Sequence, residues 1–337
     1  MGRLTSRHKS FLAAEFPGHC NFDERERRFY SHDVAAIPNL IKPLVGDTIP
    51  DGIVQPENEE DLVTLVSFAI KNGIKLTPRA KASSGYGGVL PVRQGLVIDF
   101  FRINRVLDID KKNLTATVQP GVVWEEIDAT LEKVGLDLKL YPSSYPGSTV
   151  GGWLAQGGTG IGSFESGWFR DNVVSARVVL GDGTVKEFSG ADLDVISDAE
   201  GTTGLISQIT IKVQPREEMD VAAIGCSDAH DTQRLMEAII ADKMPIWSML
   251  FINPRMAEMK NRVPLMEHHD RPMEERVLLP ASYIISLAFR EKDSRYIRER
   301  LGELMKSCKA EMLSERIARH EWDNRFKLMV VKRLGRY

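Results

Sequence analysis

The clearest pattern of hydrophobic and polar positions lies in the stretch IVQPENEEDLVTLVSFAIKNGIKLTP, residues 53–78. Its central apolar residues recur at spacings of three and four, as on one face of a helix: Leu62, Leu65, Val66, Ala69 and Ile70. We expect this helix to begin after Asn58, a good capping residue followed by three acidic residues, and to end at Gly73. The order strand, helix, strand predicts a short βαβ crossover.

Short apolar runs follow at close intervals and predict further strands at residues 96–100, 106–110 and 115–120, with a helix at about 123–134. The stretch SARVVLGDGTVKEF contains two β-rich runs joined at Asp182-Gly183. Both residues tolerate positive φ, so this pair predicts a tight hairpin. The run LISQITIKVQP closes the series at Pro215. Residues 46–216 are therefore expected to form one α+β domain.

The sequence pattern changes after residue 215, where strand candidates alternate with longer helical stretches. The runs DVAAIGCSD and SYIISLAFRE are strand candidates, and each is followed by a helical stretch, AHDTQRLMEAIIADK and DSRYIRERLGELMKSCKAE. Two such units predict a second domain of sheet plus helices over residues 217–337. Residues 1–45 mix charged and aromatic residues and then carry prolines, so we expect an N-terminal segment that lies on the first domain.

Composition and charge narrow the classes of partner. The 337-residue chain is 42% hydrophobic and 27% charged, which is ordinary for a globular protein of two domains. Its 44 basic and 47 acidic side chains give a net charge of −3, which disfavours nucleic acid and anionic membranes as partners. No 18-residue apolar run and no signal core occur, so no transmembrane segment and a cytoplasmic location are expected.

The three cysteines, Cys20, Cys226 and Cys308, are far apart and form no CxxC pair. Their thiols alone therefore build neither a zinc site nor an iron-sulfur cluster, and no metal site is expected. Motifs for Rossmann dinucleotide binding, for the P-loop and for common hydrolases are also absent from the sequence.

Glycine gathers in three clusters of the first domain: PRAKASSGYGGV, YPSSYPGSTVGGWLAQGGTGIGSF and DAEGTTGLIS. Without a Cβ, glycine lets the backbone approach a ligand closely, and successive N–H groups that point inward make a nest for phosphate oxygens. A single glycine cluster is more simply explained as a turn that reverses the direction of the chain. Three in one domain favour the binding of an anionic ligand.

Four stretches resemble a known family in the same order along the chain: residues 53–89, 95–127, 141–185 and 200–210. Together they resemble the FAD-binding domain of the vanillyl-alcohol oxidase or PCMH-type flavoproteins, in the branch of the glycolate oxidase subunit and D-lactate dehydrogenase. The resemblance runs from about residue 53 to 215. It implies an α+β fold: a two-subdomain FAD-binding domain with FAD between the subdomains, followed by a cap domain of α/β type that binds substrate.

The resemblance also implies the residues that bind FAD. The first loop would hold the diphosphate, and the second and third clusters, with one pair between them, would contact the rest of the cofactor: Arg79, Ala80, Lys81, Ala82, Ser83, Ser84, Pro146, Gly147, Ser148, Thr149, Val150, Gly151, Gly152, Asp171, Asn172, Gly201, Gly204 and Ile206. The family commonly has a run of glycines where Ala80-Lys81-Ala82 stand. No histidine occurs in this loop, so the FAD is expected to be non-covalent.

The implied activity is that of an FAD-dependent dehydrogenase. It would oxidise a 2-hydroxy acid such as D-lactate or glycolate by hydride transfer to flavin and pass the electrons to a protein acceptor, for example an iron-sulfur subunit. The sequence does not identify the catalytic residues. Arg255, Arg262 and Arg271 are candidates for binding the substrate carboxylate only by their location.

The second domain departs from the family pattern. The histidine-rich metal motif of this branch is missing, and only part of the expected cap follows residue 215. A fragment, a split gene and a subunit completed by another chain all stay open. The main alternative function is therefore an FAD-binding electron-transfer or scaffold subunit of a larger redox complex, without a complete substrate site. A relationship to the cell-wall enolpyruvyl reductase ranks below both, because its catalytic serine and glutamate are not found.

Overall fold

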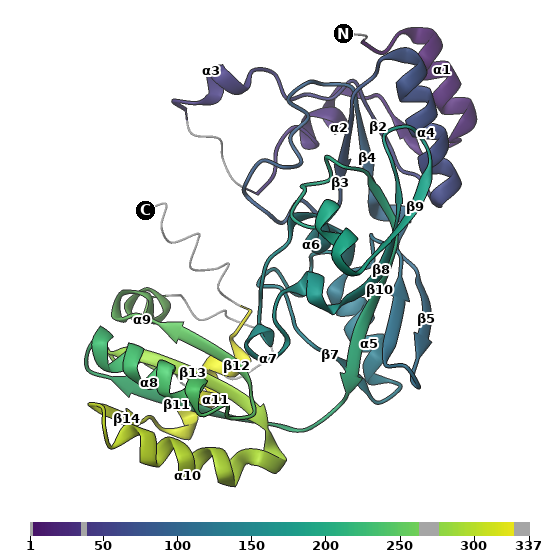
Figure 1. Cartoon of the computed structure of the whole chain (residues 1–337). Coiled ribbons are helices and arrows are strands. Elements are labelled where there is room, and N and C mark those ends of the chain that lie inside the picture. The colour runs from purple at the N-terminus through teal and green to yellow at the C-terminus, as the bar shows by residue number, and fades with distance from the viewer. Residues whose placement is uncertain (1–2, 35–38, 263–275, 327–337) are drawn as a thin grey trace, which may run out of the picture. The chain divides into compact units, whose positions relative to one another are not determined.

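The computed structural model describes residues 3–34, 39–262 and 276–326. The chain forms two compact units. Unit 1 comprises Met1–Thr159 and Trp168–Pro215, and unit 2 comprises Gly160–Gly167 and Arg216–Tyr337. In the described residues unit 1 contains two sheets and unit 2 contains one, and each unit has its own hydrophobic core (Figure 1).

A small sheet begins unit 1, in the order β1-β2-β4-β3. Its strands are β1 (Cys20–Asn21), β2 (Gly52–Val54), β3 (Leu76–Arg79) and β4 (Leu96–Asp99). Both β2 and β3 run parallel to β4, which lies between them, so the predicted crossover spans a third strand. The N-terminal segment enters this structure directly, because β1 pairs with β2 and Leu12 of α1 (Ser6–Glu15) is fully buried in the core.

Helix α4 (Glu59–Asn72) joins the small sheet to the rest of unit 1 and confirms the predicted helix. The side chain of Asn58 accepts a hydrogen bond from the N–H of Asp61, and Gly73 ends the helix in a left-handed conformation. Four of the five predicted apolar positions are buried with β2 and β4 and with Val179 and Leu205 of the neighbouring sheet, whereas Ile70 is 55% exposed. The helix is thereby the common core element of two subdomains.

The second sheet of unit 1 has the order β5-β6-β10-β8-β9, and β7 also pairs with β10. All of its pairs are antiparallel, and its strands are β5 (Val106–Asp110), β6 (Thr115–Val118), β7 (Leu136–Leu138), β8 (Val173–Val179), β9 (Val185–Ser189) and β10 (Leu205–Pro215). The Asp182-Gly183 hairpin forms as predicted: the N–H of Leu180 bonds to the carbonyl of Thr184 between β8 and β9. Helices α5 (Trp124–Glu132) and α6 (Val150–Gln156) lie between β6 and β8 in the chain.

Unit 2 is built around an antiparallel sheet in the order β12-β13-β11-β14. The strands and the helices that follow two of them are β11 (Met219–Cys226), α8 (Ala229–Ala241), β12 (Ile246–Ile252), β13 (Tyr283–Arg290), α10 (Ser294–Met305) and β14 (Ala310–Met312). This is the split β-α-β arrangement of a ferredoxin-like fold. Both predicted strand-helix units are confirmed, whereas β12 and β14 were not predicted. Helices α7 (Ser163–Ser166), α9 (Pro254–Asn261) and α11 (Glu315–Asp323) complete the unit.

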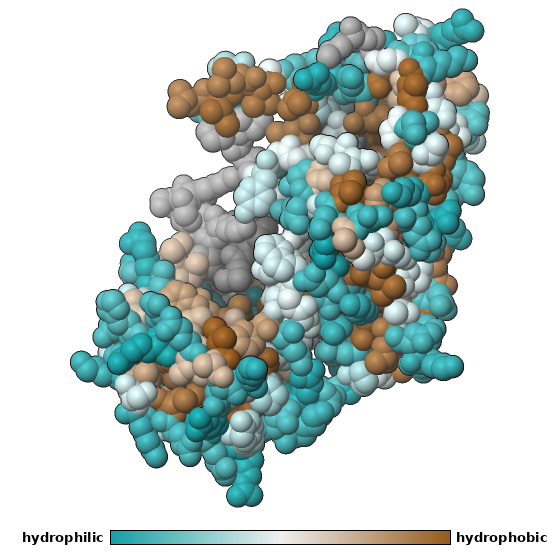
Figure 2. Space-filling view, viewed as in Figure 1, coloured by the Kyte–Doolittle hydropathy of each residue, from teal (hydrophilic) through white to brown (hydrophobic). Residues whose placement is uncertain are grey.

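Surface hydrophobic residues gather at the short helix α3 (Lys42–Val45), as Figure 2 shows. The side chains of Leu40 and Leu44 are 88% and 85% exposed. The other helix of the N-terminal segment, α2 (Glu24–Phe29), begins at Asp23, whose carboxylate accepts hydrogen bonds from the N–H groups of Arg25 and Glu26. Pro43 lies in the first turn of α3.

Candidate functional site

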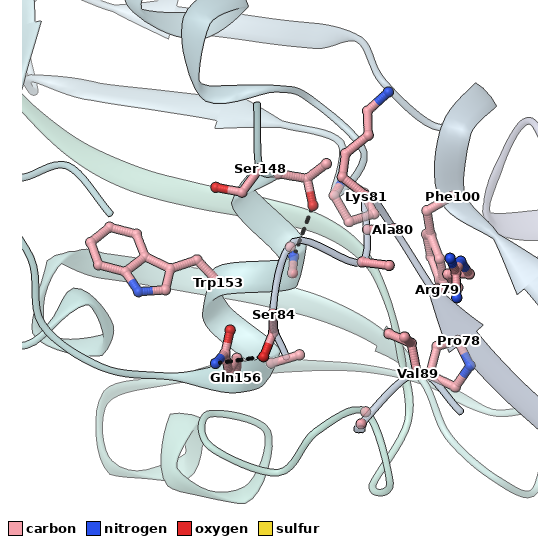
Figure 3. Close-up of a pocket in the computed structure, with 18 of the residues that line it drawn as sticks. Pro78, Arg79, Ala80, Lys81, Ser84, Val89, Phe100, Ser148, Trp153 and Gln156 are labelled. Carbon is pink, nitrogen blue, oxygen red and sulfur yellow. Dashed lines mark hydrogen bonds between the residues drawn. The ribbon is translucent and has the colours of Figure 1, made fainter. Parts of the chain in front are cut away.

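A pocket lies within unit 1 where the ends of the small sheet, α6 and the loop before β10 come together (Figure 3). Its lining comes from three stretches of chain, within residues 78–89, 144–156 and 200–206, and from Phe100 and Pro120. The empty space, its open mouth included, is about 870 Å³.

The first glycine cluster contributes the stretch directly after β3. All six residues predicted there line the pocket: Arg79, Ala80, Lys81, Ala82, Ser83 and Ser84. Within the described chain, the main-chain N–H groups of residues 81–84 have no protein hydrogen-bond acceptor. Ala82 has a φ of +50°, the left-handed conformation that favours glycine. A short run of available amides around a left-handed residue is the backbone arrangement that binds phosphate oxygens.

The two cationic side chains of this loop are engaged elsewhere. Arg79 donates from Nη1 to the carbonyl of His32 at 2.8 Å. The Nζ of Lys81 lies 4.8 Å from the centre of the Phe101 ring, and its side chain extends away from Ser84 in Figure 3. The loop therefore offers anion binding through its amides and hydroxyls, with these two charges nearby.

The second cluster lines the pocket with four of its seven predicted residues, Ser148, Thr149, Gly151 and Gly152. Thr149 caps α6 and accepts a 3.1 Å hydrogen bond from the N–H of Gly152. Gly151 lies against Pro120, such that a Cβ on it would be 2.4 Å from the Pro120 Cβ. Glycine at this position lets the helix pack tightly against the loop before α5.

The third cluster places all three of its predicted residues, Gly201, Gly204 and Ile206, in the pocket wall. Gly201 has a φ of +72°, and a Cβ there would meet the Pro78 ring at 2.6 Å. This contact brings the loop before β10 against the end of β3. The three clusters, far apart in sequence, thus surround one space.

The other predicted residues do not line this pocket. Val150 is fully buried in the core, and Pro146 follows a cis peptide bond and accepts a hydrogen bond through its carbonyl from Glu125. Asn172 is buried and donates to the carbonyl of Trp168, while Asp171 forms an ion pair with Arg170. Gly147 is also outside the lining. These positions shape the loops around the pocket, and their predicted contact with the cofactor stays a prediction.

Several lining residues were not predicted. Gln156 donates from Nε2 to Oγ of Ser84 at 3.2 Å and so joins the second cluster to the first (Figure 3). Trp153 stacks on Phe169, with ring centres 4.4 Å apart. Glu200 lines the pocket beside Gly201. These residues lie inside or next to the glycine clusters, and this position in the sequence could have identified them. They were missed because the predictions there considered mainly glycines and hydroxyl-bearing residues.

The pocket fits a ligand that is anionic in one part and apolar in another. The free amides at 81–84 suit phosphate oxygens, and Phe100, Pro120, Trp153 and Leu205 supply apolar surface. Partial burial, and then the neighbouring Asp198 carboxylate, raise the pKa of Glu200 above its usual range. A dinucleotide with a diphosphate and aromatic rings matches this combination.

The remaining candidate groups that belong to the described residues lie outside the pocket. Among the described residues, no group of three or more His, Cys, Asp or Glu side chains is placed to hold a metal ion. Arg262 pairs with Glu258 on the surface of α9, Arg255 is exposed on the same helix, and Arg271 lies outside the described residues. No helix in the described part of the chain is long and apolar enough to cross a membrane.

Comparison with known proteins gives the following matches. Residues 50–189 match the model of the family described as FAD binding domain. The glycolate oxidase subunit GlcD of Bacillus subtilis is 32% identical over 238 residues, which cover 67% of this chain and 49% of the relative. The mitochondrial D-lactate dehydrogenase [cytochrome] of Arabidopsis thaliana is 32% identical over 185 residues, covering 52% of this chain and 32% of the relative.

A solved structure of alkyldihydroxyacetonephosphate synthase has the same fold, with a TM-score of 0.80 at 22% identity. The match covers 96% of this chain and 66% of that one. The chain spans about half of the length of the Bacillus subtilis relative and about a third of the length of the Arabidopsis thaliana relative. The predicted fold class, a PCMH-type FAD-binding domain with a second α and β domain, is confirmed.

Proposed function

Residues 50–189 form an FAD-binding domain of the PCMH type, and from this premise we propose that the protein is an FAD-dependent oxidoreductase that oxidises a 2-hydroxy acid. The names of two relatives, a glycolate oxidase subunit and a D-lactate dehydrogenase, support this substrate class. FAD is the cofactor of the domain. When bound, it supplies the acceptor for the hydride and the route to an electron acceptor.

One observation supports the proposal that FAD binds in this pocket. The N–H groups of residues 81–84 have no protein acceptor within the described chain, and they line a space that the other two glycine clusters also surround. In this proposal those amides and the hydroxyls of Ser83 and Ser84 bind the diphosphate. Glycines 151, 152, 201 and 204 let backbone approach the cofactor closely. The apolar part of the lining would exclude water from its rings.

The main alternative is an FAD-binding electron-transfer or scaffold subunit. It is supported by the short match to the relatives, of which this chain covers 49% and 32%. The described lining residues include no histidine and no tyrosine, and Glu200 is the one carboxylate among them that could accept a substrate proton. In this alternative the substrate site would be completed by other chain segments, and the protein acceptor would be another subunit such as an iron-sulfur protein.

The first experiment tests FAD binding. The purified chain is expected to show flavin absorption, and acid precipitation is expected to release the flavin because no covalent link is proposed. A Cβ on Gly152 would lie 2.9 Å from Oγ1 of Thr149 and 3.7 Å from the Cβ of Ala80, so Gly152→Leu adds a side chain beside two residues that line the pocket. This variant should lose the flavin. Gly181→Leu, where an added Cβ has no atom within 4 Å, should keep it. A wild-type chain that takes up no FAD would reject the proposed site.

The second experiment tests the substrate class. Anaerobic addition of D-lactate or glycolate to the flavin-loaded chain should bleach the flavin absorbance at about 450 nm. Bleaching without any partner supports the dehydrogenase. Retention of the flavin colour with every 2-hydroxy acid in a panel, by a chain that binds FAD, would reject the dehydrogenase in favour of the scaffold subunit.

A further inference from the structure

Two of the three cysteines belong to unit 2, and the sheet brings them to the same place. Cys226 is the last residue of β11, and Cys308 lies in the turn between α10 and β14. β11 and β14 are antiparallel neighbours, with Cys226 opposite Ala310 (Figure 1). The ladder continues for one more residue, because the N–H of Ser227 donates a 3.2 Å hydrogen bond to the carbonyl of Lys309. Cys308 is the next residue along the chain.

The register therefore places the two thiols diagonally across the pair of strands. Cys308 comes two residues before Ala310, the partner of Cys226, and side chains two residues apart in an extended chain point to the same face. Both cysteines indeed pack on the core that the sheet shares with α8 and α10. Cys226 is 1% exposed within this core, whereas Cys308 is partly exposed at its edge.

The charges around the two sulfurs give them different properties. Burial raises the pKa of the Cys226 thiol, and the sulfur of Cys308 adds to this effect. A hydrogen bond to Asp231 raises the pKa of the Arg234 guanidinium, and Cys308 again adds to the effect, so this cation is close to Cys308. Reactive cysteines occupy partly exposed positions beside cations, whereas buried thiols are inert toward reagents in solution. Cys308 is thus open to a reagent, and Cys226 is open to Cys308.

The backbone around Cys308 suits a bond between the two sulfurs. Diagonal neighbours on adjacent strands have Cα atoms about 7–8 Å apart, with Cβ atoms closer. A disulfide requires a Cα separation below about 7 Å. Cys308 lies outside the regular elements on both sides, because α10 ends at Met305 and β14 begins at Ala310. A small change in the turn closes this difference while the ladder between β11 and β14 stays paired.

From this arrangement we propose that Cys308 and Cys226 form a peroxide-oxidation site, at which Cys308 reacts first and Cys226 then closes a disulfide. The Cys308 thiolate attacks hydrogen peroxide: an S–O bond forms, the O–O bond breaks and hydroxide leaves. The sulfur is oxidised to a sulfenic acid and the peroxide is reduced. The Cys226 sulfur then attacks the Cys308 sulfur, so that an S–S bond forms and the S–O bond breaks.

The hydroxyl group leaves as water with the proton of the Cys226 thiol. In sum, two thiols and one hydrogen peroxide give one disulfide and two molecules of water. The site lies entirely within unit 2, so the inference does not rest on the proposed function.

The third cysteine, Cys20 of unit 1, provides an internal control. Its Sγ donates a 3.3 Å hydrogen bond to the carbonyl of Leu12, and burial raises the pKa of this thiol to about 11. The thiol is thereby held in its protonated form, which is not the reactive one. Oxidation of Cys20 therefore measures the nonspecific reaction in the same sample.

The experiment treats the folded full chain with hydrogen peroxide, blocks the remaining thiols with iodoacetamide and maps disulfides by mass spectrometry without reduction. A peptide that joins Cys226 to Cys308 should appear at least tenfold faster than any oxidation product of Cys20. Cys20→Ser should form this link at the wild-type rate.

Two further variants separate the roles of the paired cysteines. Cys226→Ala should leave Cys308 as a sulfenic acid that dimedone traps. Cys308→Ser should leave Cys226 unoxidised, because its sulfur is buried. Circular dichroism before oxidation establishes that each variant is folded, and the wild-type map decides the question where a variant is not.

A folded wild-type chain that forms no link between Cys226 and Cys308, or forms it only after unfolding in urea, would overturn the inference. Oxidation of Cys20 at the same rate as Cys308 would also overturn it. So would a covalent dimer on a non-reducing gel in place of the internal link, because Cys308 would then react with a second copy of the chain.

Discussion

The phenol of Tyr30 donates a 2.7 Å hydrogen bond to Oδ2 of Asp99, at the end of β4. The same oxygen accepts from Nε2 of Gln55 at 2.8 Å, and Oδ1 accepts from the N–H of Phe101. Two residues further along the N-terminal segment, the carbonyl of His32 accepts from the Arg79 guanidinium at the end of β3. These hydrogen bonds hold the N-terminal segment against the ends of β4 and β3, and β3 is followed directly by the pocket loop at residues 79–84.

Tyr30→Phe should destabilise unit 1. Partial burial and the Asp99 carboxylate raise the pKa of the Tyr30 phenol well above its usual range, so the hydroxyl is a donor at all ordinary pH values. Removing a hydrogen bond to a charged group costs about 1.5–3 kcal/mol. Urea unfolding followed by circular dichroism measures the loss. Tyr86→Phe is the control, since Tyr86 is 82% exposed. Equal stability of the two variants would contradict the role of Tyr30.

Glu59 predicts a pH dependence of stability. Its carboxylate accepts a 2.6 Å hydrogen bond from Nη2 of Arg177 on β8 and another from the hydroxyl of Ser207 on β10. These bonds, the one from Arg177 first, lower the pKa of Glu59. A carboxyl whose pKa is lower in the folded state stabilises the fold above its unfolded pKa, and this contribution is lost as the pH falls through the folded pKa.

Glu59→Gln should therefore lower the free energy of unfolding by about 1 kcal/mol at pH 7, a modest value because the pair is partly exposed. The difference from wild type should shrink below about pH 4. The measurement is urea unfolding across this pH range. Glu60→Gln, in the same first turn of α4 but without a hydrogen bond to another element, is the control for the helix dipole. A pH-independent difference would contradict the assignment.

The two alanines of the pocket loop should respond oppositely to glycine. Ala82 has a φ of +50°, so Ala82→Gly relieves the strain of its Cβ, and after the entropy lost by glycine the chain should be unchanged or more stable by up to about 1 kcal/mol. Ala80 does not have positive φ, and Ala80→Gly should cost about 0.5–1 kcal/mol. Melting temperatures of the flavin-free variants decide this. The same sign for both would show that the backbone at 82 is not strained.

Two helical glycines provide a matched pair for packing. Gly151→Ala in α6 would bring a Cβ to 2.4 Å from the Pro120 Cβ, with the backbone of Pro120 also within 3 Å. We expect a loss of about 1–3 kcal/mol from overpacking and weaker FAD binding. Gly302→Ala in α10 meets no atom within 4 Å and should stabilise by about 0.5–1 kcal/mol through helix propensity. Thermal unfolding and FAD titration of both variants test this, and a G151A protein as stable as wild type would contradict it.

Features that depend on neighbouring residues could be predicted from the sequence alone. Asn58 and Gly73 set the ends of α4 because capping involves only the adjacent turn. Asp182-Gly183 set the hairpin between β8 and β9 for the same reason, since the turn is made by the pair itself. The three glycine clusters marked the pocket wall, and the resemblance of the first domain to an FAD-binding domain is confirmed over residues 50–189.

The contacts between distant segments could not be predicted from the sequence and became visible only in the folded chain. In the folded chain β4 lies between β2 and β3, and β1 belongs to the same sheet. The Arg79 guanidinium donates a hydrogen bond to the carbonyl of His32. Val150 and Asn172 lie in the core, and Glu200 lies in the pocket. The physical reason is that strand order, side-chain direction and burial follow from pairings between residues far apart in the chain. Local propensity contains no information about those partners.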